Sequence, residues 1–216
     1  MVTFYLVRHG FSVANDKKIF AGNSDVPLSE IGKKQAELVS DYIINNLKID
    51  LIFSSELSRA VDTISKVAKT FNLPINKNSN FKEIYGGKWE MLTFEQIINL
   101  YGEDFWKWQT DISNSRCTGG ESFEEVKIRA FNELKMLAEK YDNKNILIGS
   151  HAGVIRTLIT AINNLSAEEC NRLGWVSNAS ITTITYYNNK FEIKALSYDE
   201  YLNGLTTSLP NGLKSN

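Results

Sequence analysis

"YLVRHGFSVAN", residues 5–15, runs from an apolar segment of strand length directly into Arg8, His9 and Gly10. The chain of 216 residues contains two histidines, and one of them stands at this junction. Residues 3–7 (TFYLV) are typical of a buried β-strand, which places His9 at the carboxyl end of that strand. Two other segments of the chain end in a similar way, and together the three predict the fold.

Strand-like and helical patterns alternate along the rest of the chain. Short apolar runs typical of buried strands occur at 50–55 (DLIFSS) and 145–150 (NILIGS). Apolar residues at helical spacing occupy 30–46, 56–71, 121–141 and 153–162. Near the end, "SITTITYY" (180–187) and "FEIKALS" (191–197) flank "NNK" and indicate a hairpin. This order predicts an α/β fold: a three-layer sandwich with a mostly parallel central sheet and helices on both faces.

Composition and charge narrow the function classes. Twenty-four Lys and Arg against 25 Asp and Glu give a net charge of −1, so neither nucleic acid nor an anionic membrane surface is an expected partner. Two cysteines make a disulfide framework improbable, and the first residues lack a secretory signal pattern, which favours a cytoplasmic protein. No apolar run approaches the roughly 20 residues of a membrane span. We expect one domain over 1–204 and a loose tail over 205–216.

Polar and charged residues gather at the carboxyl ends of the three predicted parallel strands. They are Arg8, His9 and Gly10 after the first strand, Ser54, Ser55 and Arg59 after the second, and Ser150, His151, Ala152 and Gly153 after the third. In open α/β sheets this edge binds ligands, and helix N-termini add backbone N–H donors there. The pattern therefore predicts an anion pocket that contains a nucleophilic imidazole, with Ala152 as a candidate phosphate-binding position.

Each of these residues also has a structural interpretation. A lone RHG tripeptide is a weak signal, a histidine beside a strand end is commonly a structural group, and Arg59 fits a surface arginine. What favours a site is the repetition: both histidines of the chain follow predicted strands, and each is followed by a glycine within two residues.

Six segments of the chain resemble motifs of the histidine phosphatase superfamily, the phosphoglycerate mutase-like proteins, and they occur in the same order. They are "LVRHGFSVAN" (6–15), "GNSDVPLSEIGKKQA" (22–36), "SSELSRAVDT" (54–63), "FKEIYGGKWE" (81–90), "GGESFEEV" (119–126) and "IGSHAGVIR" (148–156). The resemblance runs from residue 3 to about 187. It implies that His9 attacks phosphorus, that Glu83 donates a proton, and that the phosphate pocket is formed by Arg8, Arg59 and His151 and lined by Asn15 and Gly22.

Elementary chemistry agrees with these assignments. Positive charges on Arg8 and Arg59 would depress the pKa of His9 and leave its imidazole neutral near pH 7. The guanidinium groups can hold the phosphoryl oxygens, and His151, if protonated, supplies a further donor. Glu83 can then serve as acid to the leaving oxygen and as base to water. We therefore expect no metal and no other cofactor.

The sequence departs from the commonest family pattern at a few positions. Phe11 and Ser12 stand where polar or threonine side chains are frequent, and Met91 follows "KWE" where glycine is usual. The segment "EIYGGKWE" resembles the phosphatase branch more than the mutase branch. At 101–109, "YGEDFWKWQ" offers Tyr101, Phe105, Trp106 and Trp108 as an apolar cap over the leaving group, with a helix core as the alternative interpretation.

The sequence thus predicts a metal-independent phosphomonoesterase that acts on a small phosphorylated metabolite through a phosphohistidine. A phosphoglycerate mutase is the alternative enzyme, and a non-catalytic module that holds a phosphorylated partner is the alternative outside enzymes. The presence of His9, Glu83 and both arginines favours catalysis. Neither the natural substrate nor the oligomeric state, a homodimer included, follows from the sequence.

Overall fold

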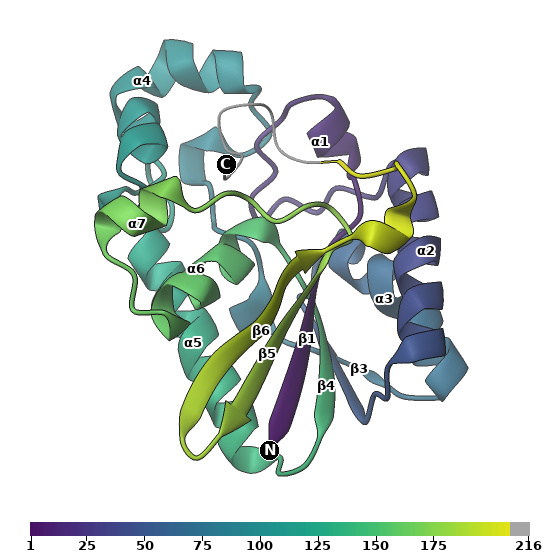
Figure 1. Ribbon diagram of the computed structural model, residues 1–216. Helices are drawn as coiled ribbons and strands as arrows, with labels where there is room; N and C mark the ends of the chain where they lie inside the picture. The colour runs from purple at the N-terminus through teal and green to yellow at the C-terminus, as the bar shows by residue number, and fades with distance from the viewer. Residues whose placement is uncertain (208–216) are drawn as a thin grey trace.

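The computed structural model describes residues 1–207, which fold around a six-stranded sheet with the order β3-β2-β4-β1-β5-β6 (Figure 1). The strands are β1 (Val2–Arg8), β2 (Leu51–Ser54), β3 (Ile75–Lys77), β4 (Asn145–Ser150), β5 (Ile181–Tyr187) and β6 (Lys190–Tyr198). The first four run parallel, β5 is antiparallel to β1, and β6 forms a hairpin with β5. This arrangement confirms the predicted mostly parallel sheet and the hairpin.

Helices cover both faces of the sheet. The α-helices are α1 (Val13–Asp16), α2 (Glu30–Asn46), α3 (Ser58–Phe71), α4 (Phe94–Thr110), α5 (Phe123–Lys140), α6 (Ala152–Ile162) and α7 (Ala167–Arg172), with short 3₁₀ turns η1 (Ser79–Phe81), η2 (Gly87–Trp89), η3 (Ile112–Asn114) and η4 (Glu200–Leu202). Helices α2 and α3 pack together on one face, and α5 and α6 pack together on the other. The predicted three-layer α/β sandwich is confirmed.

Alternating side chains of the central strands form the two halves of the core. Phe4 and Leu6 of β1 point into the cluster that α5 and α6 cover, whereas Val7 joins Ile52 and Leu147 in the cluster beneath α2 and α3. These side chains are almost completely buried. The period of two along β1 therefore fixes its register, because a slip by one residue would exchange the two faces.

The parallel strands end level with one another. In the pairing register Arg8 lies opposite Ser150, and Ser54 lies opposite Gly149. The residues that follow β1, β2 and β4 consequently meet at one edge of the sheet. In Figure 1 this is the upper edge, and α4 stands beyond it.

Helix α4 is tied to the fold by aromatic side chains. Trp108 packs edge-to-face on Phe20 and on Trp89, at centroid distances of 6.3 and 5.8 Å, and Phe105 contacts Trp89 at 6.0 Å. Nearby, Met91 has φ +62°, in the left-handed region that favours glycine. Its backbone thus adopts the conformation expected of the glycine that the family pattern usually has there.

The expected loose tail is only partly within the described residues. Gln35 Nε2 donates to Leu205 O at 2.7 Å and to Thr207 Oγ1 at 2.9 Å, and Asn178 N donates to Thr207 O at 2.9 Å. Residues 205–207 are therefore hydrogen-bonded to the domain, and 208–216 lie outside the described residues.

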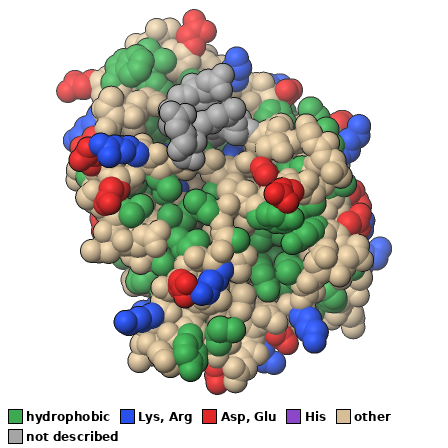
Figure 2. Space-filling view, in the orientation of Figure 1, with side chains coloured by type: hydrophobic (Ala, Val, Ile, Leu, Met, Phe, Trp, Pro, Cys, Tyr) green, Lys and Arg blue, Asp and Glu red, His purple; other side chains and the backbone are tan. Residues whose placement is uncertain are grey.

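The surface carries charges of both signs. Figure 2 shows Lys and Arg interspersed with Asp and Glu around one face, on which no histidine is visible. Within residues 1–207, no helix is both long and apolar enough to cross a bilayer.

Candidate active site

A cavity of about 380 Å³ opens at the carboxyl ends of β1, β2 and β4. Seven of the predicted site residues line it, namely Arg8, His9, Asn15, Gly22, Arg59, Glu83 and Ala152. The eighth, His151, does not line the cavity, but its ring centroid lies 5.2 Å from that of His9. The structure thus brings together residues that are up to about 140 positions apart in the sequence.

His9 presents a neutral imidazole to the cavity. Its Nδ1 lies 2.7 Å from Gly10 O. A carbonyl oxygen only accepts, so Nδ1 carries the proton and the Nε2 lone pair is free. Burial, followed by the positive charges of Arg59 and Arg8, lowers the pKa of His9 well below its usual range. His9 therefore has the protonation state of a nucleophile.

The backbone of His9 is held on both sides. His9 N donates to Ser150 O at 3.0 Å, and Asn178 Nδ2 donates to His9 O at 3.1 Å. Asn178 also lies 3.3 Å from Asn15 Oδ1, which it joins to the same cluster. No pattern in the sequence singled out Asn178, because it lies in the irregular segment before β5.

Two buried guanidinium groups face the cavity. Arg8 donates from Nη1 to Val176 O, and its buried Nε has no hydrogen-bond partner among residues 1–207. Burial lowers the pKa of Arg8 to about 10, so it stays cationic at neutral pH. Arg59 donates to Gly22 O at 2.7 Å and to Ser24 O at 2.9 Å. Burial lowers the pKa of Arg59 as well. The two cations create a positive end of the cavity that suits an oxyanion.

His151 sits at the N-cap of α6 and is fully buried. Its Nε2 lies 2.7 Å from Ser55 Oγ, and its Nδ1 has no partner within the described part of the chain. Burial, then the positive charge of Arg59, lowers the pKa of His151 well below its usual range. The sequence allowed a protonated His151, whereas in this structure the ring is neutral. The sequence places Ser55 at a strand end but does not predict its contact with His151.

Glu83 lies at the junction of the cavity with α6. Gly153 N donates to Glu83 Oε2 at 3.2 Å, and Ile84 N donates to Oε1 at 3.0 Å. A Cβ on residue 153 would approach Glu83 Oε1 to 2.3 Å, so only glycine allows this contact. The carboxylate also raises the pKa of both Arg8 and Arg59 against the effect of burial.

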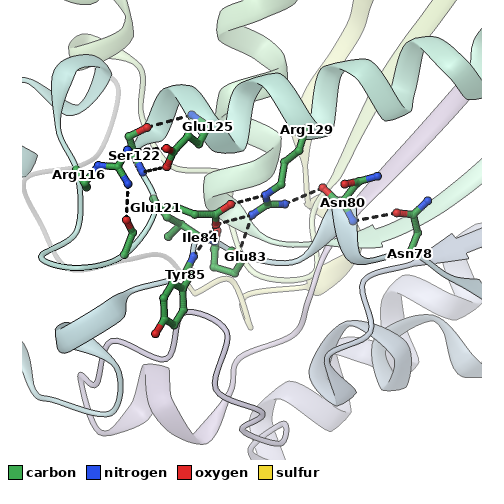
Figure 3. A network of polar contacts seen from close by, with 11 residues as sticks. Asn78, Asn80, Glu83, Ile84, Tyr85, Arg116, Glu121, Ser122, Glu125 and Arg129 are labelled. Carbon is green, nitrogen blue, oxygen red and sulfur yellow. Dashed lines mark hydrogen bonds and ion pairs between the residues drawn. The ribbon is translucent and has the colours of Figure 1, made fainter.

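Arg129 of α5 holds the segment that carries Glu83 (Figure 3). It donates from Nη1 to Asn80 O at 2.7 Å and from Nη2 to Glu83 O at 3.0 Å. Its Nε and Nη2 also donate to the Glu121 carboxylate at 2.8 and 3.0 Å, and that carboxylate accepts from Tyr85 N at 2.8 Å. This clamp was not predicted, because an arginine within a helical pattern carries no sign of its partner.

The Glu90 carboxylate joins two loops of the site: residues 22–24, which accept hydrogen bonds from Arg59, and the loop after Glu83. Glu90 accepts from Asn23 N and Ser24 N at 2.7 Å each and from Gly86 N at 2.9 Å. Gly22 has φ +49°, and a Cβ there would come within 2.2 Å of Glu90 Oε1. The loop is therefore shaped around the carboxylate.

Much of the remaining cavity lining is apolar. This apolar wall consists of Ile19, Phe20, Ile84, Phe94, Phe105, Trp108 and Trp175, and Lys18 and Gln109 also line the cavity. Of the four residues offered as an apolar cap, Phe105 and Trp108 line the cavity and are also core residues of α4. Trp106 is 56% exposed and, like Tyr101, is not among the lining residues.

The two residues after the RHG tripeptide, Phe11 and Ser12, have different surroundings. Phe11 is not among the lining residues, and its N–H donates to Gln35 Oε1 at 2.7 Å. Ser12 lines the cavity and caps α1. Within residues 1–207, His, Cys, Asp and Glu side chains form no group of three or more that could hold a metal ion.

Comparison with known proteins agrees with this geometry. The family model for the histidine phosphatase superfamily (branch 1) matches residues 4–199. Phosphoserine phosphatase 1 of Hydrogenobacter thermophilus is 31% identical over 184 residues, which are 85% of this chain and 86% of that protein. Adenosylcobalamin/alpha-ribazole phosphatase of Escherichia coli is 30% identical over 76% of this chain and 80% of that protein.

A solved structure shows the same fold. Mycobacterial glucosyl-3-phosphoglycerate phosphatase, in complex with VO3, superimposes with a TM-score of 0.83 and is 26% identical. The match covers 91% of this chain and 98% of that one. The three relatives share the word phosphatase in their names, and the compounds in those names differ.

Proposed function

Since the chain belongs to the histidine phosphatase superfamily (branch 1), we propose that it hydrolyses small phosphate monoesters through a phosphohistidine on His9 without a metal ion. The observation that carries this proposal is the state of the His9 ring. Its Nδ1–H is engaged by Gly10 O, and its depressed pKa leaves Nε2 unprotonated beside two buried arginines. A neutral imidazole in an anion pocket is suited to attack phosphorus.

In the first step, the Nε2 lone pair forms a bond to phosphorus as the bond from phosphorus to the ester oxygen breaks. Glu83, protonated for this step, gives its proton to the departing oxygen, and an alcohol leaves. In the second step, the Glu83 carboxylate takes a proton from water as the water oxygen attacks phosphorus. The P–N bond then breaks, inorganic phosphate is released, and His9 and Glu83 return to their starting states.

Positive charge and fixed donors stabilise the transferring group. Arg8 lines the cavity, and its buried Nε lacks a partner in the described structure, so a phosphoryl oxygen would satisfy it. Ala152 adds the N-terminus of the 11-residue helix α6. A bound phosphate dianion would raise the pKa of His151 and favour its protonation. These groups supply the charge that metal ions provide in other phosphoryl-transfer enzymes.

The covalent step predicts a phosphorylated His9. A reaction quenched at alkaline pH and analysed by mass spectrometry should show phosphate on a peptide that contains His9, and acid should remove it, because P–N bonds are acid-labile. His9→Ala should abolish both the adduct and turnover. Phosphate found on a serine, or a His9→Ala variant that remains active, would show that the mechanism is wrong.

Because the proposed reaction uses no metal ion, enzyme activity should resist chelators. Exhaustive treatment with EDTA should leave turnover nearly unchanged, because Arg8, Arg59 and the α6 N-terminus provide the positive charge. Measurement of phosphate release before and after dialysis tests this. Activity that disappears and returns only with an added divalent ion would contradict it.

A further inference from the structure

We propose that the preferred substrates are phosphate monoesters whose leaving alcohol carries an uncharged, apolar ring, and that Phe105 and Trp108 of α4 select it. This inference rests on the proposed phosphatase function. It concerns the apolar wall, the part of the cavity lining that the proposed catalytic groups do not form.

The cavity has room for more than a phosphoryl group. Its volume of about 380 Å³ lies within the range of roughly 300–1,000 Å³ that is typical of small-molecule sites. The phosphoryl group belongs at the end where Arg8, His9 and Arg59 converge. The same cavity is also lined by Phe20, Phe94 and the α4 side chains Phe105 and Trp108. A substrate that fills the cavity must therefore place its leaving group against these rings.

The aromatic wall is preformed. Trp108 and Phe105 are 8% and 5% exposed, and both are fixed by neighbouring rings. Trp108 contacts Phe20 with an interplanar angle of 78°, and Phe105 contacts Phe94 at a centroid distance of 6.2 Å. Little conformational freedom remains for these side chains to lose on binding, which favours affinity for a ring that matches them.

The charges along the apolar wall disfavour an anionic leaving group. Apart from Arg8 and Arg59, which belong to the phosphoryl end, Lys18 is the one cationic side chain among the described residues that line the cavity, and Lys18 is exposed. A second carboxylate or phosphate on the leaving alcohol would lose its water against apolar walls without a buried cation to replace it. An apolar ring instead gains from burial.

The apolar wall also disfavours the alternative function, that of a phosphoglycerate mutase. Phosphoglycerates carry a carboxylate on the group that must stay bound between two transfers. Among the described residues, the apolar wall offers that carboxylate the neutral N–H of Trp175 but no buried cation, so retention of an anionic group is disfavoured. Release of an apolar alcohol and hydrolysis of the phosphoenzyme fit this cavity better.

A substrate series tests the proposal. Benzyl phosphate, glycerol 3-phosphate and 3-phosphoglycerate all release alkyl alcohols, and they differ in whether the leaving group is apolar, polar or anionic. We expect kcat/KM to be about 10- to 100-fold higher for benzyl phosphate than for the other two, which is the ratio that burial of one ring supplies. Equal or faster turnover of 3-phosphoglycerate would overturn the proposal.

Variants of α4 locate the effect. Trp108→Leu and Phe105→Leu keep apolar volume but remove a ring, and each should reduce the preference for benzyl phosphate over glycerol 3-phosphate by about tenfold. Trp106→Leu is the matched control, because Trp106 is on the same helix but 56% exposed and outside the cavity lining. It should retain the wild-type preference. Circular dichroism identifies a variant that fails to fold. If one of the two ring variants fails, the substrate preference of the other tests the proposal.

Binding of phosphonates separates this proposal from the proposed function. Benzylphosphonate cannot be hydrolysed, so its affinity relative to methylphosphonate reports on the wall alone. Tighter binding of benzylphosphonate that is lost in Trp108→Leu supports the apolar leaving-group site even if no ester is turned over, a result that would contradict only the hydrolase function. Equal binding of the two phosphonates would overturn the proposal.

Discussion

His9 and Glu83 have complementary surroundings at the residue scale. The His9 ring is buried between cations, whereas the Glu83 carboxylate receives backbone N–H donors from Gly153 and Ile84. In the proposed mechanism, the neutral His9 ring attacks phosphorus. Glu83, which lies beside the start of α6, is the proposed proton donor.

Glu83→Gln tests the acid role. An alkyl phosphate releases a poor leaving group whose oxygen must gain a proton, whereas nitrophenyl phosphate releases a stable anion. General-acid help is typically worth 10²- to 10⁴-fold, roughly 3–5 kcal/mol of barrier. The variant should therefore slow single-turnover formation of the phosphoenzyme far more for benzyl phosphate than for nitrophenyl phosphate. Equal losses with the two esters would mean that Glu83 only shapes the cavity.

The sequence predicts that the residues at the strand ends come together. It does not predict the side chains that hold the surrounding loops in place. Arg8, His9 and Arg59 follow apolar runs whose ends must meet at one sheet edge, so their convergence could be predicted. The contacts of Arg129 and Glu90 depend on how loops of irregular backbone fold over that edge. No periodicity describes such loops, so sequence gives no register for them.

At the scale of elements, helix α5 controls the segment before η2. Arg129 donates to the carbonyl oxygens of Asn80 and Glu83, and its partner Glu121 accepts from Tyr85 N. The clamp formed by Arg129 of α5 and Glu121, which precedes the helix, thus fixes the backbone on either side of the Glu83 side chain. Its ion pair is largely shielded, with side-chain exposures of 19% and 23%.

Arg129→Met should reduce kcat by about 10- to 100-fold for an alkyl ester, because small displacements of a catalytic group have effects of this size. If Arg129 acts through Glu83, the loss should be much smaller for nitrophenyl phosphate and should nearly vanish in a Glu83→Gln background. Arg172→Met is the matched control, since Arg172 forms an exposed pair with Glu168. Additive losses in the double variant would show that Arg129 acts independently of Glu83.

Some helices and strands are easier to predict from the sequence than others. The long amphipathic helices α2, α3 and α5 lie within two residues of their predicted bounds, because their apolar stripes match the helical period. Strand β3 has only three residues, and just one of them is apolar. Helix α4 carries a kink at Tyr101, where φ is −139° and ψ is 36°, and its rings turn toward both core and cavity. A single apolar face therefore does not describe it.

For the whole molecule, two buried neutral histidines make stability depend on pH. In both His9 and His151 the pKa is lowered, so below about pH 6.5 the unfolded chain binds protons that the folded chain does not. The free energy of unfolding should be greatest above pH 6.5. It should fall as the pH drops below that value, by up to about 1.4 kcal/mol per pH unit for each histidine.

Urea denaturation at pH 7.5, 6.5 and 5.5 measures this dependence. The double variant His9→Asn, His151→Asn should show a shallower fall over the same range, because Asn does not titrate. Inorganic phosphate should also protect the wild type at pH 5.5 if the bound anion favours the protonated form of His151. A double variant with the wild-type pH dependence would contradict the assignment to these histidines.

The separation of α4 from the strand ends has a consequence for how such an enzyme could diversify. Arg8, His9, Arg59 and His151 follow the central strands, whereas Phe105 and Trp108 belong to one helix encoded between residues 94 and 110. Exchange of that helix with one from a homologue would replace part of the proposed leaving-group wall and leave the proposed nucleophile and the two arginines in place. Recombination of one short gene segment could then change the substrate preference. The residues proposed to carry out the phosphoryl transfer would not have to change.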